Sequence, residues 1–193
     1  MILACGALSK EISTLKRINN WSHLKTQYLP AILHNSPEKI TEELRKILLI
    51  SQANYSKIFV GFADCGTGGK IDSLIEELGL QRLPGAHCYE FFAGEKLFDQ
   101  IMKNEPGTFF LTDFLVRTFE KLVWQGLMID KKPELLDIFF KNYKKIMYLA
   151  QTENINLQKK AIEISMRLKL EYEYRLVGFG DLEKSLSLLK NRK

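Results

Sequence analysis

The sequence predicts an α/β fold: a single Rossmann-like domain of about six or seven mostly parallel strands, with helices on both faces of the sheet. Two observations predict it. Short apolar stretches alternate with longer stretches of helical periodicity along the 193 residues, and in such an order each helix returns the chain so that the next strand runs parallel. Clusters of polar residues and glycine follow the apolar stretches, which is typical of the sheet edge where α/β proteins bind ligands.

The expected elements have local reasons in the sequence. Ser9 is a candidate N-cap, Pro37 favours the first turn of a helix, and Gly79 is suited to ending one. The expected strands cover residues 1–5, a segment before Pro30, the stretch from 57, and then 80–83, 108–111, 146–150 and 172–177. The expected helices are one beginning at 9 and then 37–53, 70–78, 94–103, 114–125, 134–143, 157–168 and 182–189. No linker divides the chain, so we expect one domain over 1–193, with a weaker indication of two halves meeting near 104–107.

The stretch 57–69 is the most informative part of the chain. An apolar run ends in Asp64 and Cys65, and the glycine-rich turn Gly66, Thr67, Gly68 and Gly69 follows, ahead of a helical stretch. Backbone N–H groups in such a turn bind anions such as phosphate. Alternatively, a helix N-terminus lowers the pKa of Cys65 and makes it a nucleophile. A tight turn that needs glycine for its backbone alone is the third interpretation.

The three cysteines, Cys5, Cys65 and Cys88, are expected to follow strands and to converge at one edge of the sheet. Their odd number argues against a disulfide framework. Three thiolates with His87 or a water molecule make a four-coordinate zinc site, and three thiolates also hold an iron–sulfur cluster. The alternative to both metal sites is that each cysteine is a small buried hydrophobic residue. The absence of a CxxC pair favours this alternative.

Other polar residues also follow expected strands. His87, Glu90 and Asp64 are the candidate acid–base residues. The candidate ligand-binding residues, besides the glycine-rich turn, are His34, Asn35, Asp113 and Gln151. Each of these residues also has a structural interpretation, because a lone histidine more often makes a structural hydrogen bond and an aspartate often caps a helix.

Several classes of partner are excluded. The net charge is +5, but the lysines are scattered and no nucleic-acid motif is present, so we expect no nucleic-acid partner. No segment reaches the roughly 18 apolar residues of a membrane span. Met1–Cys5 lacks the basic start and the long apolar region of a signal peptide. We therefore expect a cytoplasmic protein that acts on a small-molecule substrate.

Across these motifs the sequence resembles the domain-of-unknown-function 1638 family. The matching stretches are 4–8 with 11–12, 29–31 with 33–35, 63–69, 84–85, 87–92, 105–109, 111–114, 142–143, 148–151 and 180–183. The family's genes are associated with corrinoid-dependent methyltransferases, so the resemblance implies a setting in methyl or one-carbon transfer. The resemblance also favours a functional role for the sheet edge that carries the three cysteines.

Three functional hypotheses remain open. The first is a metal–thiolate protein, with zinc as the favoured metal, that acts in methyl or one-carbon transfer at the carboxyl edge of the sheet. The second is a non-catalytic accessory protein that binds a corrinoid protein, a methyltransferase or a small anionic ligand. The third is a redox protein with an iron–sulfur cluster.

Overall fold

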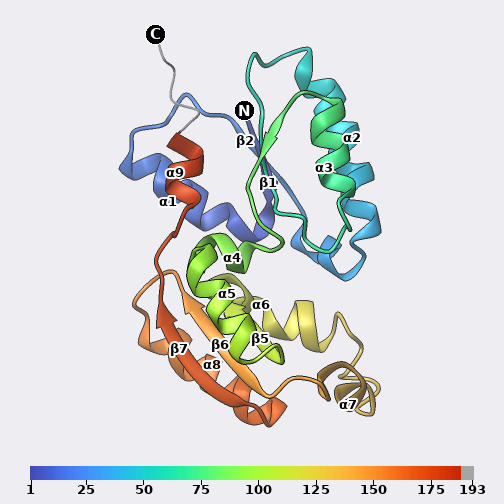
Figure 1. Cartoon of the computed structure of the whole chain (residues 1–193), viewed down its shortest axis with the longest axis vertical. Helices are drawn as coiled ribbons and strands as arrows, with labels where there is room; N and C mark the ends of the chain where they lie inside the picture. Colours follow the sequence, from blue (N-terminus) through green and yellow to red (C-terminus); the bar gives the residue numbers. More distant parts are fainter. Residues whose placement is uncertain (188–193) are drawn as a thin grey trace. The chain divides into compact units, whose positions relative to one another are not determined.

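The computed structural model describes residues 1–187 and divides the chain into two compact units (Figure 1). Of the described residues, the first unit contains Met1–Phe91 and Asp181–Ser187, and the second contains Phe92–Gly180. Parallel sheets with helices around them confirm the α/β class. The single Rossmann-like domain is not confirmed, because the strands form two separate sheets. The stretch 104–107 lies inside the second unit, and residues 188–189 of the expected last helix lie outside the described part of the chain.

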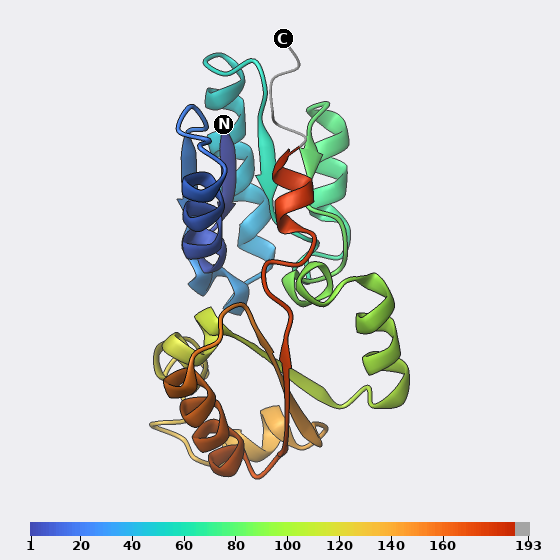
Figure 2. The ribbon, with the colours of Figure 1, turned by 90° about the vertical axis from the view of Figure 1, so that its left-hand side faces the viewer.

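The first unit is built on a parallel sheet in the order β2-β1-β3-β4. Its strands are β1 (Ile2–Cys5), β2 (Thr26–Leu29), β3 (Phe59–Gly61) and β4 (Gln81–Arg82). Its helical elements are η1 (Gly6–Leu8), α1 (Ser9–Ile18), η2 (Ala31–Asn35), α2 (Glu38–Gln52), α3 (Lys70–Glu77), the start of α4 (Cys88–Ala93) and α9 (Leu182–Ser187). Figure 1 and Figure 2 show α1 on one face of this sheet and α2 with α3 on the other.

The centre of this sheet is tightly packed. Ile2, Leu3 and Ala4 of β1 are fully buried, as expected for a parallel strand covered on both faces. In the neighbouring strand, a Cβ added at Gly61 would lie 2.6 Å from the Cβ of Ala4. Glycine is therefore required at position 61 for β3 to lie this close to β1.

The strand order reverses direction between β1 and β3. The connection after β1 leads to β2 on one side, whereas the connection after β3 leads to β4 on the other side. Open α/β sheets bind ligands in the crevice outside such a reversal, because the two outgoing loops separate there. The carboxyl ends of β1 and β3 are therefore the expected position of a site in this unit.

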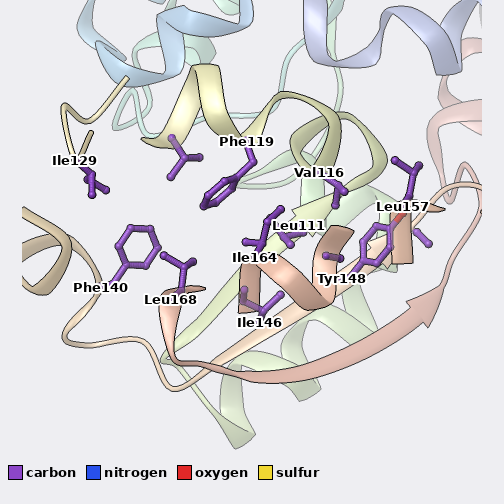
Figure 3. Close-up of a cluster of buried hydrophobic side chains, with 13 residues drawn as sticks. Leu111, Val116, Phe119, Ile129, Phe140, Ile146, Tyr148, Leu157, Ile164 and Leu168 are labelled. Carbon is purple, nitrogen blue, oxygen red and sulfur yellow. The ribbon is translucent and has the colours of Figure 1, made fainter. Parts of the chain in front are cut away.

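The second unit has a parallel sheet in the order β5-β6-β7. Its strands are β5 (Thr108–Thr112), β6 (Lys145–Ala150) and β7 (Glu171–Leu176). Its helical elements are the end of α4, then α5 (Glu95–Asn104), α6 (Asp113–Phe119), the π-helix η3 (Glu120–Trp124), α7 (Leu135–Phe140) and α8 (Ile155–Leu168). Side chains of β5, β6, α6 and α8 form one apolar cluster, which includes Leu111, Ile146 and Ile164 (Figure 3). On the other face of β5, the ring of Phe110 lies 5.3 Å from that of Phe98 in α5.

Some local expectations from the sequence are wrong. Ser9 is the first residue of α1, and the N-cap position is taken by Leu8, which caps with no side-chain hydrogen bond. Cys88 does not directly follow a strand, because β4 ends at Arg82 and Cys88 begins α4. The helix expected over 114–125 changes to a π-helix at Glu120. Among residues 1–187, none of the helices is long and apolar enough to cross a membrane.

Candidate functional site

A small cavity in the first unit brings together the three cysteines at the carboxyl ends of β1 and β3. Its volume is about 20 Å³, which is enough for one particle the size of a water molecule. It is lined by Cys5, Ala7, Leu8, His34, Gly61, Phe62, Ala63, Cys65, Cys88 and Phe91. Most of the lining is apolar, so the thiols and one imidazole supply the chemistry of the cavity.

Cys5 is the last residue of β1 and is only 4% exposed. Its Sγ accepts a hydrogen bond from the N–H of Ala7 at 3.3 Å, which caps η1. The Nδ1 atom of His34 lies 4.0 Å from the same sulfur. Burial raises the pKa of the Cys5 thiol to about 12, against the opposing effect of the Ala7 N–H. Cys5 is therefore protonated at neutral pH.

Cys65 has a left-handed backbone conformation, with φ of +53°. Non-glycine residues adopt this conformation only when the surrounding structure compensates for its cost. Its N–H donates to the carbonyl of Ala86 at 2.8 Å. Burial raises the pKa of its thiol to about 11, and Asp64 adds to this effect. The expectation that a helix N-terminus lowers this pKa is wrong, because burial outweighs it.

Cys88 begins α4 and is partly exposed as a residue. Burial raises the pKa of its thiol well above the ordinary value, and the charges of Cys65 and Cys5 contribute further. The effect of Cys65 on Cys88 is larger than that of Cys5. The three thiols therefore interact electrostatically, and ionising one of them makes the ionisation of another more costly.

The two candidate histidines differ in position. His34 lies on the cavity, its ring stacks on Phe62 with an interplanar angle of 12°, and its Nδ1 lies 3.0 Å from the carbonyl oxygen of Ala31. His34 is exposed along part of its surface, yet protein atoms around the ring desolvate it and lower its pKa. His87 is exposed, packs near Tyr89, and is not among the residues that line the cavity.

The glycine-rich turn closes around the side chain of Asp64. One oxygen of the Asp64 carboxylate accepts hydrogen bonds from the Thr67 hydroxyl at 2.7 Å and from the Gly69 N–H at 2.8 Å. The other oxygen accepts from the Gly68 N–H at 3.2 Å. Burial opposes the charge of Asp64, but these hydrogen bonds outweigh it and lower its pKa. The N–H groups that the sequence suggested for a bound anion thus already hold a carboxylate of the same loop.

Glu90 lies in the first turn of α4 and holds the loop that precedes this helix. Its carboxylate accepts a hydrogen bond from the Ala86 N–H at 2.7 Å. A Cβ added at Gly85 would lie 2.8 Å from this carboxylate. Glu90 therefore packs against the backbone of 85–86.

The remaining sequence candidates lie elsewhere. Asn35 ends η2 and is exposed. Asp113 and Gln151 belong to the second unit, where the Gln151 N–H donates to Asp113 Oδ1 at 3.1 Å. The hydroxyls of Tyr148 and Thr152 also donate to the Asp113 carboxylate, at 2.7 and 2.5 Å. Asp113 is 1% exposed, so these groups form a buried polar network of their own.

Glu11 is a residue near the site that the sequence reasoning missed. It lies on the buried face of α1 with Ile12 and Leu15, is 4% exposed, and its charge contributes to raising the pKa of Cys88. Its spacing of four residues from Leu15 was the available signal, because it places the carboxylate on the apolar side of the helix.

The described side-chain positions do not form a finished metal site. Among residues 1–187, no group of three histidine, cysteine, aspartate or glutamate side chains is placed so that it could hold a metal ion. A metal ion bound by the three cysteines would therefore require their side chains to move toward one another.

Fold and cavity together define an α/β protein with a thiol-lined cavity at the reversal point of a parallel sheet. The chain belongs to the family described as "Protein of unknown function (DUF1638)", which it matches over residues 28–186. This match confirms the resemblance seen in the sequence. Cys65 and Cys88 lie within the matched residues, and Cys5 precedes them. No curated protein and no solved structure matches the chain.

Proposed function

We propose that the cysteine cavity binds one zinc ion through Cys5, Cys65 and Cys88, and that the protein acts in methyl or one-carbon transfer in the cytoplasm. The observation that carries the proposal is that three cysteines distant in sequence line one cavity of about 20 Å³. Thiolates are ligands that select zinc, copper(I) or iron–sulfur clusters. The small volume favours a single ion over a cluster.

The donor set suits a metal cation, although the side chains must move to reach one. The raised pKa values of Cys5 and Cys65, about 12 and about 11, mean that thiol protons must leave when a metal binds. A cation replaces those protons and removes the repulsion among the thiolates. The left-handed backbone at Cys65 is consistent with a residue held for function rather than for packing.

His34 is the better candidate for a fourth ligand. The Nδ1–H of His34 donates a hydrogen bond to the Ala31 carbonyl at 3.0 Å, which leaves Nε2 as the nitrogen with a lone pair. Because Nδ1 is also the nitrogen that lies 4.0 Å from Cys5 Sγ, the imidazole ring would turn to direct Nε2 at a metal beside that sulfur. Metal-binding histidines usually donate their other N–H to a carbonyl or carboxylate in this way. His87 is the alternative ligand, and its charge contributes to lowering the pKa of His34.

A bound zinc ion whose fourth position passes from His34 to a substrate thiol would supply Lewis acidity that keeps that thiol deprotonated near neutral pH. The residues of this chain would contribute the surroundings. Phe62 and Phe91 line the cavity and place apolar surface beside the thiols. A substrate thiolate at this position would attack a methyl group carried by a partner: the S–CH3 bond would form, the bond between the methyl group and its carrier would break, and the carrier would keep that electron pair. The corrinoid-dependent methyltransferases that the resemblance implies suggest a corrinoid protein as that partner.

Metal analysis of protein purified without added metal tests the proposal. We expect close to one equivalent of zinc per chain, and its loss in Cys5→Ser, Cys65→Ser and Cys88→Ser. His87→Ala and His34→Ala distinguish the two candidate fourth ligands. Less than about a tenth of an equivalent of any transition metal, in both aerobic and anaerobic preparations, would contradict the proposal. Iron with visible absorption in the anaerobic preparation would support the iron–sulfur alternative instead.

A further inference from the structure

Two carboxylates lie next to the cavity cysteines in the sequence and accept hydrogen bonds from nearby loops. Asp64 precedes Cys65, and Glu90 follows Cys88 by two residues. The sequence suggested both as acid–base residues, but both accept hydrogen bonds from backbone N–H groups, and Asp64 also accepts one from the Thr67 hydroxyl. Those contacts indicate a different role.

Asp64 fixes the loop that begins at Cys65. Its carboxylate receives hydrogen bonds from Thr67, Gly68 and Gly69, so it closes the loop into a ring. The left-handed conformation of Cys65 lies inside this ring. Because that conformation is costly for a non-glycine residue, the closed loop helps to maintain it.

Glu90 fixes the loop that leads to Cys88. Its carboxylate accepts the Ala86 N–H at 2.7 Å, and its own N–H donates to the carbonyl of His87 at 3.1 Å. Each of these two hydrogen bonds joins a residue before Cys88 to Glu90, which follows it, so both close a turn that contains Cys88. Gly85, at φ of +92°, leaves the space that the carboxylate occupies.

The two loops are bonded to one another through their backbones. The Asp64 N–H donates to the carbonyl of Gly85 at 3.1 Å, and the Cys65 N–H donates to that of Ala86 at 2.8 Å. Ala86 therefore links Cys65 on its carbonyl side with Glu90 on its N–H side. Loosening either carboxylate would release one cysteine without disturbing the core of the sheet.

We propose that Asp64 and Glu90 are positioning residues that hold the Cys65 and Cys88 thiols at the cavity by closing these two linked loops. This inference rests on the proposed function in one respect: the two thiols are held in place so that they can bind one metal ion. It assigns neither carboxylate to contact with a substrate.

The rate at which each cysteine reacts with N-ethylmaleimide tests the proposal. Trypsin places the three cysteines in separate peptides, because Lys10, Lys57, Lys70 and Arg82 lie between them. We expect Asp64→Ala to raise the labelling rate of Cys65 about tenfold or more, and Glu90→Ala to do the same for Cys88. In both variants the rate of Cys5 is expected to stay unchanged.

Three further variants separate positioning from general loss of stability. Asp64→Asn should restore most of the protection, because the amide oxygen still accepts from Thr67 and Gly69. Thr67→Val, which removes one donor, should give a smaller rise at Cys65. Glu76→Ala, an exposed carboxylate of α3, is the matched control and should change nothing. A parallel rise at all three cysteines, or no rise at Cys65 and Cys88, would overturn the proposal.

Titration of the same variants with Co²⁺ connects the inference with the metal site. We expect Asp64→Ala and Glu90→Ala to bind Co²⁺ about tenfold more weakly than the wild type and with weaker thiolate absorption bands. Wild-type affinity in both variants would overturn the positioning of thiols for a metal. A wild-type protein that binds no Co²⁺ would contradict the proposed function, whereas the labelling rates would still decide the roles of Asp64 and Glu90.

Discussion

At the scale of single residues, burial determines the pKa values of the cysteine thiols. Cys5 and Cys65 are 4% and 8% exposed, and burial is the largest cause of the raised pKa of each thiol. A thiol whose pKa is higher in the folded than in the unfolded protein binds its proton more tightly when folded. Its contribution to stability is therefore complete below the unfolded pKa and is lost as the pH rises through the folded pKa.

This sign gives a prediction for the metal-free protein. Between pH 9 and pH 11, the free energy of unfolding should fall by about 1.4 kcal/mol per pH unit for each buried thiol that remains protonated. Urea denaturation at a series of pH values measures it. Cys65→Ala is the control, since the variant should lose less stability over the same interval. Equal pH dependence in the variant and the wild type would contradict the effect of burial on Cys65.

At the scale of elements, the contact between β1 and β3 positions the site, because Cys5 and Cys65 follow these two strands. Gly61→Ala places a methyl group 2.6 Å from the Cβ of Ala4, so we expect a loss of about 1–3 kcal/mol in the free energy of unfolding. Urea denaturation measures the loss. The double variant Gly61→Ala with Ala4→Gly should recover part of it, and additive losses would show that the close approach of the two strands is not the cause.

The polar network between the start of α6 and the end of β6 gives a second prediction at this scale. Asp113→Ala leaves the Tyr148 hydroxyl and the Gln151 N–H without their buried acceptor, so we expect a loss of about 2–4 kcal/mol in stability. Tyr148→Phe removes one of these hydrogen bonds and should cost about 1 kcal/mol. Maleimide labelling of the cysteines should keep its wild-type rates in folded Asp113→Ala. Unchanged stability would contradict the contribution of this network, and selective labelling of one cysteine would mean that Asp113 has a role beyond it.

At the scale of the whole molecule, the alternation of apolar and helical stretches was enough to predict parallel α/β structure and the end of β1 at Cys5. It did not predict two sheets, because periodicity describes each strand but not its partner. Neither did it predict that Asp64 would occupy the glycine-rich turn, since a side chain and an external anion satisfy the same N–H groups. The pKa of Cys65 was predicted in the wrong direction because burial depends on packing by residues far away in the sequence, such as Leu8 and Phe91.

X-ray absorption at the zinc edge of the purified protein tests the central claim, that the three cysteines bind one metal ion, most directly. The account predicts three sulfur neighbours at about 2.3 Å and one lighter ligand at about 2.0–2.1 Å, and the loss of the bound zinc signal in Cys65→Ser. Bound zinc with nitrogen and oxygen neighbours alone, or a sulfur count unchanged in Cys65→Ser, would contradict it.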